Sequence, residues 1–199
     1  MKKLGLFLLI GILAIFVGCK KKAVGIKTTE NNTTSNYHVG GYYDKNGITG
    51  IICKVSSDGN HGTVVSLDEA KLPWSLEYVT TGASDYMNGP FNTNTIISNF
   101  DLEKYPAFKW CNDKNTNGVT GWFIPSFIDF FAMFGNIDDV NKALSTYGGI
   151  LISKEDDYWS SEEISTSTAL IENAHTYYDY ILYTDGKSDS LNVRALYKF

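Results

Sequence analysis

A short run of the sequence, DKNTNG, carries the oxygen-bearing side chains that open a calcium-binding loop. Asp113, Asn115 and Asn117 alternate along the chain, and Gly118 follows them. This spacing matches positions 1, 3, 5 and 6 of an EF-hand loop, which also needs a bidentate glutamate at position 12. That position is Ile124, which offers no side-chain oxygen. The run therefore favours a turn, because Asp and Asn tolerate left-handed backbone, and we predict no metal here.

Four acidic residues flank the run YWSS in two adjacent pairs. They are Asp156, Asp157, Glu162 and Glu163. Glycosidases use two carboxyl groups, one to protonate the leaving group and one to act as nucleophile or base. A carbohydrate-active hydrolase is therefore one hypothesis. Solvated carboxylates at the two ends of a strand are the alternative.

The segment 164–192 is dense in Ser, Thr, Asn, Asp and Tyr. Rigid aromatic and adaptable polar side chains of this kind are typical of binding surfaces. An amphipathic hairpin with tyrosines on both faces is the alternative. The predicted ligand, a glycan or a protein, would contact Tyr177, Tyr178, Tyr180, Tyr183, Glu162 and Asn173.

Other reactive side chains are sparse. His38, His61 and His175 are the only imidazoles, and no spacing among them is typical of zinc. Cys53 and Cys111 could form a disulfide in an oxidising compartment, or could be two small buried hydrophobes. We predict no cofactor and assign no catalytic residue.

The N-terminus has the pattern of a bacterial lipoprotein. Residues 1–18 combine a MKK start with an apolar stretch too short to span a bilayer, which predicts a signal peptide. Cys19 follows a small residue, as in a lipobox, so we expect lipid attachment there. Residues 19–38 read as a flexible tether because they lack large apolar side chains. The prediction is a lipid-anchored envelope protein, with the outer membrane favoured and the face left open.

The remainder, residues 39–199, has the length of one domain. From Tyr37 onwards there are eleven Lys and Arg against twenty-one Asp and Glu, a formal charge of 11 − 21 = −10. A surface with this charge disfavours polyanions, so we predict no nucleic-acid partner.

Strands are expected at both ends of this domain and helices in its middle. Asp58-Gly59 separates two β-branched runs and predicts a hairpin. Pro73 limits a predicted turn of helix, and Asp185-Gly186 is expected to join the final two strands. The expected strands are 48–55, 62–67, 156–163, 167–172, 177–184 and 191–199, and the expected helices are 67–76, 93–105, 106–111, 127–134 and 138–147. Segregated elements of this kind indicate an α+β fold.

Three short motifs in order resemble the Fibrobacter succinogenes major paralogous domain and the C-terminal domain of the Legionella collagen-like adhesin. The first motif is Trp122, Pro125 and Ser126; the second is Tyr158, Trp159, Ser160, Ser161 and Glu162; the third is Val193, Arg194 and Ala195. The resemblance implies a C-type-lectin-like fold. It implies terminal strands paired in one sheet, two flanking helices, and a second small sheet whose long loops carry the ligand.

Related folds include sulfatase-modifying oxidases, which need a reactive cysteine pair. Cys53 lies in a predicted strand interior and Cys111 before a loop, so we expect neither to be an activated thiol with a lowered pKa. The resulting hypothesis is a membrane-anchored, adhesin-like binding module without enzymatic activity. A carbohydrate-active hydrolase and a purely structural envelope lipoprotein are the alternatives.

Overall fold

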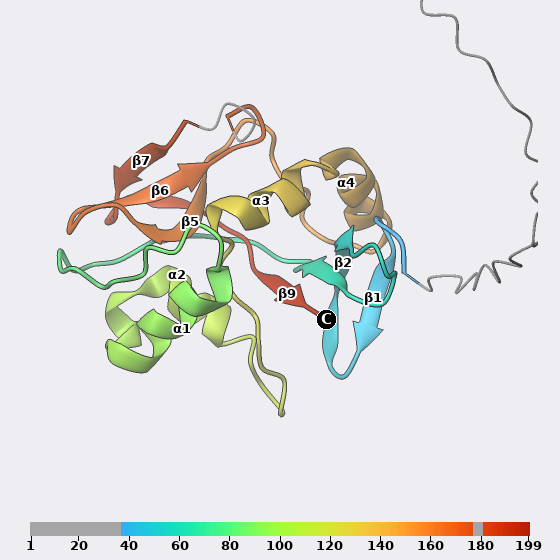
Figure 1. The fold of residues 1–199 in the computed structure, drawn as a ribbon, viewed down its shortest axis with the longest axis horizontal. Helices are drawn as coiled ribbons and strands as arrows, with labels where there is room; N and C mark the ends of the chain where they lie inside the picture. The colour runs from blue at the N-terminus through green and yellow to red at the C-terminus, as the bar shows by residue number, and fades with distance from the viewer. Residues whose placement is uncertain (1–36, 177–180) are drawn as a thin grey trace, which may run out of the picture. The chain divides into compact units, whose positions relative to one another are not determined.

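A computed structural model describes residues 37–176 and 181–199 (Figure 1). The signal peptide, Cys19 and nearly all of the predicted tether lie outside the described residues. The elements, in order, are β1 (Tyr42–Lys45), β2 (Ile48–Val55), β3 (Gly62–Val65), β4 (Ala70–Pro73), α1 (Gly89–Asn99), a 3₁₀ turn (Leu102–Lys104), α2 (Pro106–Asn112), α3 (Phe127–Phe134), α4 (Ile137–Thr146), β5 (Tyr158–Glu163), β6 (Thr168–Glu172), β7 (Tyr183–Gly186), β8 (Ser190–Val193) and β9 (Leu196–Lys198). The predicted α+β class is confirmed.

Sheet A contains both ends of the domain in the order β1-β2-β3-β9. The predicted hairpin is β2 and β3, in which Ile51 pairs with Val65. Gly59 in its turn has φ +72, a left-handed conformation that a Cβ would strain. The C-terminal strand then pairs antiparallel with β3.

The expected direct pairing of the first and last strands is wrong. β1 pairs with β2, and β2 and β3 separate it from β9. The short link at Asn46-Gly47, where both residues have positive φ, returns the chain at once and gives β2 its first partner. The two ends still meet through side chains, because the rings of Tyr37 and Phe199 lie 4.7 Å apart.

Sheet B has the order β4-β8-β5-β6-β7 and corrects two predictions. The segment expected to be a turn of helix is strand β4, whose Pro73 sits at a sheet edge where a missing N–H is tolerated. The final strands of the sheet do not form a hairpin. β7 pairs with β6, whereas β8 lies between β4 and β5.

Two hydrophobic cores lie on opposite sides of the sheets. One includes Ile52, Val64 and Trp159 with residues of α1 and α2. The other includes Ile51, Val65 and Tyr158 with residues of α3 and α4. Successive strand residues point to opposite faces, so β2, β3 and β5 each supply residues to both cores. The resemblance implied two flanking helices, whereas the described residues form four α-helices, two for each core.

Candidate functional site

Strand β5, the YWSSEE segment, is buried along its whole length. Tyr158 faces α3 and α4, and Trp159 faces α1 and α2. The Trp159 indole donates to the Leu72 carbonyl at 2.9 Å, and the Trp74 indole donates to the Ser160 carbonyl at 2.9 Å. Trp159 is therefore a core anchor that ties β5 to β4 and to the segment after it.

Two residues of the resemblance, Tyr158 and Arg194, meet at the partly buried carboxylate of Glu69. The Tyr158 hydroxyl donates to Glu69 Oε2 at 2.9 Å, and Arg194 Nη2 donates to the same oxygen at 2.9 Å. Arg194 also donates to the carbonyls of Ser66 and Ile150, and is 1% exposed. These bonds join β5 and the β8–β9 junction to the loop after β3, so both residues have a structural role.

The Trp122-Pro125-Ser126 motif builds the start of α3. Ser126 and Asp129 form a reciprocal capping box, in which Ser126 N and Oγ donate to Asp129 Oδ2 at 3.1 and 2.8 Å. Ser161 N donates to the Pro125 carbonyl at 2.8 Å, and Ser160 Oγ lies 3.2 Å from the same oxygen. Trp122 is 6% exposed and contacts Tyr197 of β9. The motif thus fixes α3 against both sheets.

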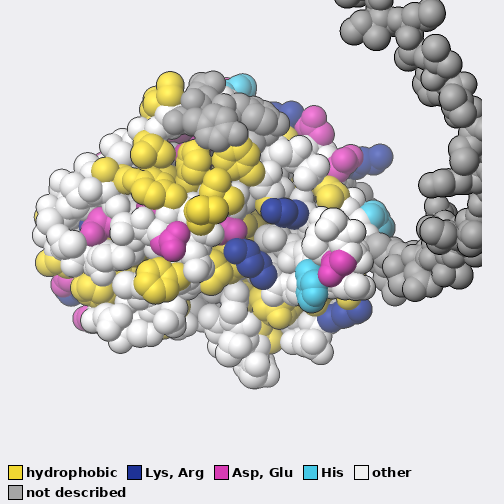
Figure 2. All heavy atoms as spheres, viewed as in Figure 1, with side chains coloured by type: hydrophobic (Ala, Val, Ile, Leu, Met, Phe, Trp, Pro, Cys, Tyr) yellow, Lys and Arg dark blue, Asp and Glu magenta, His cyan; other side chains and the backbone are white. Residues whose placement is uncertain are grey.

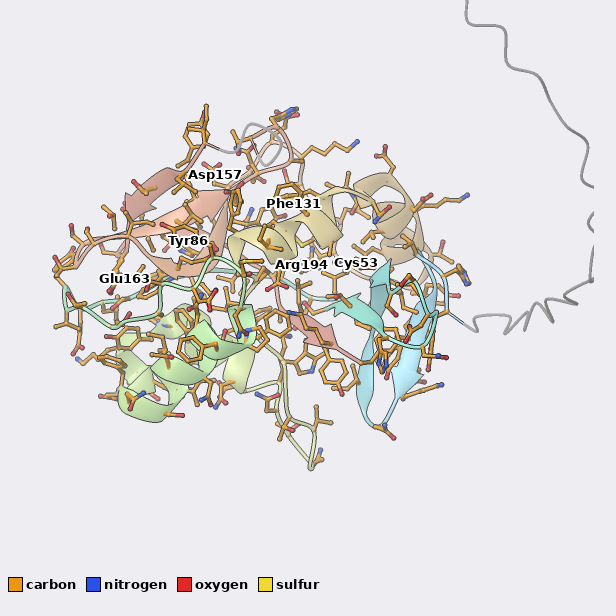
Figure 3. The ribbon with its side chains drawn as sticks, in the orientation of Figure 1. Cys53, Tyr86, Phe131, Asp157, Glu163 and Arg194 are labelled. Carbon is orange, nitrogen blue, oxygen red and sulfur yellow. The ribbon has the colours of Figure 1, made fainter. Side chains whose placement is uncertain are left out.

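Glu163, labelled in Figure 3, forms a buried ion pair with Lys187. Lys187 Nζ lies 2.5 Å from Glu163 Oε2, with both side chains almost fully excluded from solvent. Thr81 supplies its N–H and hydroxyl to the same carboxylate at 2.9–3.0 Å. Lys187 Nζ also lies 4.6 Å from the centre of a Trp74 ring. Burial lowers the pKa of Lys187, and Glu163 opposes that shift. Lys187 lies in a predicted turn, and nothing in the sequence indicated that it would form a buried ion pair.

Glu162 and Glu172 form a second buried acidic cluster, on the side of α3. Glu162 accepts hydrogen bonds from Phe127 N at 2.7 Å and from the hydroxyls of Ser160 and Ser161. Both carboxyl oxygens of Glu172 are buried with no hydrogen-bond partner among the described residues. Burial raises the pKa of Glu162 to about 7. Burial, and then the charges of Glu162 and Asp157, raise the pKa of Glu172 to about 8.

The four acidic residues that suggested a hydrolase are not gathered in one solvent-exposed site. Glu162 is fully buried at an α-helix N-terminus, and Glu163 is engaged by Lys187. Asp157 is half-buried and accepts a hydrogen bond from the Asn173 amide at 2.8 Å. Asp156 alone of the four is exposed. Asp156 and Asp157 both line a surface cavity of about 160 Å³, whereas Glu162 and Glu163 are buried away from it, so the two acidic pairs do not face each other across a common cleft.

The predicted ligand residues fall in different environments. Asn173 is half-buried, and its side-chain oxygen accepts from the N–H groups of His175 and Thr176 at 2.9 and 3.0 Å. Tyr183 on edge strand β7 is 39% exposed. Glu162 does not reach the surface. Tyr177, Tyr178 and Tyr180 lie outside the described residues.

An exposed apolar surface lies beside this region, and the sequence analysis missed it. We define the α3 face as Tyr86, Met87, Ile128 and Phe131. The first three are 38%, 70% and 38% exposed. Ile128 N donates to the Tyr86 carbonyl at 3.1 Å, which joins the helix to the loop. Figure 2 shows hydrophobic side chains gathered there, and Figure 3 labels Tyr86 and Phe131 in the same view.

The sequence held a signal for this face. Seven of the eight residues of α3 are apolar, all but Asp129, which is more than a single core stripe requires. Phe127, Phe130 and Phe134 fill the core, whereas Ile128 is exposed and Phe131 is partly buried.

The DKNTNG run is a turn whose side chains serve the backbone. Asn115 Oδ1 accepts from Trp122 N at 3.2 Å, and Asp113 pairs with Lys109 at 3.0 Å. Asn117 and Gly118 both have positive φ. Within residues 37–176 and 181–199, no three His, Cys, Asp or Glu residues lie close enough together to hold a metal.

The two described cysteines are unpaired and buried. Cys53 lies in the core with α3 and α4, and Cys111 lies in the core with α1 and α2. Burial raises the pKa of Cys53 to about 12 and raises that of Cys111 as well. Both thiols therefore behave as small hydrophobes rather than nucleophiles.

Comparisons with known proteins place the fold. No protein-family model matches the chain, and no curated protein matches it significantly. Among solved structures, it is similar to a fimbrial protein from Bacteroides ovatus, with a TM-score of 0.65 and 17% sequence identity. The match covers 82% of this chain and 49% of that one, so the chain corresponds to about half of the fimbrial protein. None of the helices in the described part of the chain is long and apolar enough to cross a membrane.

Proposed function

We propose that this protein is a membrane-anchored lipoprotein whose domain is an adhesin-like binding module without enzymatic activity. The α3 face carries the proposal. Isolated exposed apolar residues are ordinary, but an apolar group on a rigid helix and an adjoining loop is typical of an interaction site. Aromatic and methionine side chains are enriched at protein interfaces, so the ligand we favour at this face is a protein.

The local structure supports a preorganised surface. The capping box fixes the first turn of α3, and Gly89 N donates to Asp129 Oδ2 at 3.3 Å, which draws the start of α1 to the same cap. Ile128 and Phe131 lie three residues apart, on one side of that helix. A surface held in this way loses little entropy on binding.

The fold comparison supports the same class of function. The similar solved structure is named a fimbrial protein, and the sequence motifs resemble adhesin and lectin-like domains. We accordingly propose a C-type-lectin-like domain, with the tyrosine-rich segment 164–192 contributing to the ligand surface beside the α3 face. The burial or pairing of Glu162 and Glu163 favours binding over hydrolysis.

The anchor is the second part of the proposal. Lipid on Cys19 would hold the domain to a membrane of the bacterial envelope, with the outer membrane favoured, because each buried CH₂ of an acyl chain contributes about 0.8 kcal/mol. Metabolic labelling with a palmitate analogue should mark the full chain and not Cys19→Ala. Labelling of Cys19→Ala to the same extent would contradict the anchor.

Binding itself is tested with residues 33–199, which contain both hydrophobic cores. The fragment is screened against arrays of extracellular and envelope proteins and of glycans. We expect saturable binding to at least one protein, and no release of reducing ends from the glycans. Absence of any saturable binding would contradict the binding module and leave the structural lipoprotein.

A further inference from the structure

A cavity of about 670 Å³ opens beside sheet A, within the described domain and apart from the α3 face. It lies between the segment before β1, the strand β1 itself and the residue that follows α4. Its lining includes Tyr42, Tyr147, His38, Asp44 and Lys45. The volume falls in the range of about 300–1,000 Å³ that is usual for small-ligand sites.

Two tyrosines form an exposed aromatic platform in this cavity. The rings of Tyr42 and Tyr147 stack with centroids 4.5 Å apart and planes 17° from parallel. They are 39% and 50% exposed. Stacking covers one face of each ring, and the part of each ring that stays exposed presents an aromatic surface at the mouth of the cavity.

The platform is held by the fold. Tyr42 and Tyr43 are successive residues of β1, so Tyr43 points the other way, into the core, where it is 5% exposed and its ring lies 4.6 Å from that of Phe199. Tyr147 caps α4, and its N–H donates to the Ala143 carbonyl at 2.9 Å. The main chain at Tyr42 and at Tyr147 is therefore fixed by strand β1 and by the end of α4.

Polar groups line the same cavity. Asp44, two residues after Tyr42 on β1, supplies a carboxylate, and His38 supplies an imidazole. Lys45 points to the opposite face of β1, with Tyr43, and donates to the Tyr37 hydroxyl at 2.5 Å. His38 is positioned by a turn in which Gly41 N donates to the His38 carbonyl at 3.0 Å. The cavity thus offers hydrogen-bond donors and acceptors at the edge of an aromatic surface.

This combination fits a pyranose ring. One face of such a ring exposes C–H groups, which pack on the negative π face of an aromatic side chain, while its hydroxyls point outward to polar groups. The domain from Tyr37 onwards has a formal charge of 11 − 21 = −10, which disfavours sulfated or phosphorylated ligands. We propose that this cavity binds a neutral carbohydrate, with a sugar ring on the Tyr42–Tyr147 platform.

The probes are neutral linear oligosaccharides of glucose, mannose, galactose and N-acetylglucosamine. Binding to residues 33–199 is measured by saturation-transfer NMR and then by calorimetry. The fragment starts before Tyr37 so that its new amino terminus stays clear of the cavity. We expect at least one probe to bind. Absence of binding in all four series at sugar concentrations of about 10 mM, well above the dissociation constant of a functional site, would overturn the proposal.

Paired variants locate the site. Tyr42→Ala and Tyr147→Ala should each weaken binding at least about tenfold, as loss of an aromatic hot spot does, whereas Tyr42→Phe and Tyr147→Phe keep the ring and should stay within about threefold. Thermal melts confirm that each variant is folded. Tyr78→Ala, at a tyrosine that is 60% exposed and outside both the cavity and the α3 face, is the matched control and should leave sugar binding unchanged. Sugar binding that survives both alanine substitutions, or that is lost in Tyr78→Ala, would overturn the assignment.

The two proposals fail separately. Loss of protein binding in α3-face variants tests the proposed function, whereas the tyrosine platform is tested with sugars alone.

Discussion

Sheets A and B differ in what they bury. The buried charged side chains of the described residues are Asp129, Glu162, Glu163, Glu172, Lys187 and Arg194, and none of them lies on a strand of sheet A. Glu162, Glu163 and Glu172 lie on β5 and β6 of sheet B. Sheet A is stabilised by apolar alternation, whereas sheet B depends on polar groups that must be paired inside the protein.

Two buried glutamates on the paired strands β5 and β6 sharpen the contrast. Glu163 has a lysine and three donor contacts from Thr81. Glu172, across from Tyr158 on the paired strand, has no hydrogen-bond partner among the described residues. Breaking the ion pair of a buried carboxylate destabilises the folded state. A buried carboxyl group without a partner instead destabilises the folded state when it ionises. The comparison therefore predicts opposite effects for substitutions at the two places.

The largest expected effect is at the ion pair of sheet B. Lys187→Met leaves the Glu163 carboxylate buried without its cation, which should lower the free energy of unfolding by about 3–5 kcal/mol. Urea denaturation of residues 33–199 measures it. Lys154→Met is the control, because its pair with Asp138 is exposed and contributes about 0–1 kcal/mol. Equal losses of stability at the two lysines would contradict the distinction between the buried and the exposed ion pair. The double variant Lys187→Met/Glu163→Gln should recover part of the stability that Lys187→Met loses.

The next effect is a dependence of stability on pH. The folded pKa of Glu172 is raised to about 8 from 4.5, so the folded state binds more protons than the unfolded state between those values. Its stabilising contribution is complete below about pH 4.5 and is lost as the pH rises through about 8.

Glu172→Gln should therefore be more stable than the wild type at pH 8.5, by on the order of a few kcal/mol, with the gain shrinking towards pH 5. Chemical denaturation at several pH values measures the difference. Asp156→Asn, an exposed neighbour, is the control and should show no such trend. A Glu172→Gln variant that is less stable than the wild type at pH 8.5 would show that the carboxylate has a partner.

A smaller effect on stability is expected in sheet A. The Tyr42–Tyr147 pair is exposed, so Tyr147→Ala should lower the free energy of unfolding by only about 1 kcal/mol. Thermal melts compare it with Tyr43→Ala, which removes a core ring and should cost about 3–5 kcal/mol. Similar losses in the two variants would mean that the platform is part of the core.

The smallest effect is expected from reducing agent. Cys53 and Cys111 lie in separate cores and are unpaired, so reduction should not change the melting temperature. A thiol reagent should label neither cysteine in the native fragment and both in denaturant. An intact mass lower by about 2 Da than that of the reduced chain would contradict this, since it would reveal a disulfide.

The difference between sheets A and B also explains which elements the sequence could predict. Alternating β-branched residues around Asp58-Gly59 predicted the β2–β3 hairpin, and the Pro-Ser start and Gly135 end predicted α3, because both signals are local. The resemblance pointed to Tyr158, Trp159 and Arg194, but their common contacts with Glu69 and with β4 are long-range and could not be derived from spacing.

Sheet B was harder to predict because its polar residues are buried. Lys187 and Glu163 look like surface residues in the sequence, and only the fold brings them together across 24 positions. β4 was predicted as a turn of helix because Pro73 is a local signal, whereas its pairing with β8 spans more than a hundred residues. The α3 face was missed because apolar residues were assigned to the core.

The most direct test of the account is the affinity of residues 33–199 for the protein ligand found on the arrays, compared across three single substitutions. Met87→Glu and Ile128→Glu place a charge on the α3 face, whereas Leu151→Glu places the same charge on a side chain that is 52% exposed elsewhere. We predict that the first two weaken binding at least about tenfold and that Leu151→Glu does not. Equal affinity for all four proteins would contradict the α3 face as the binding surface.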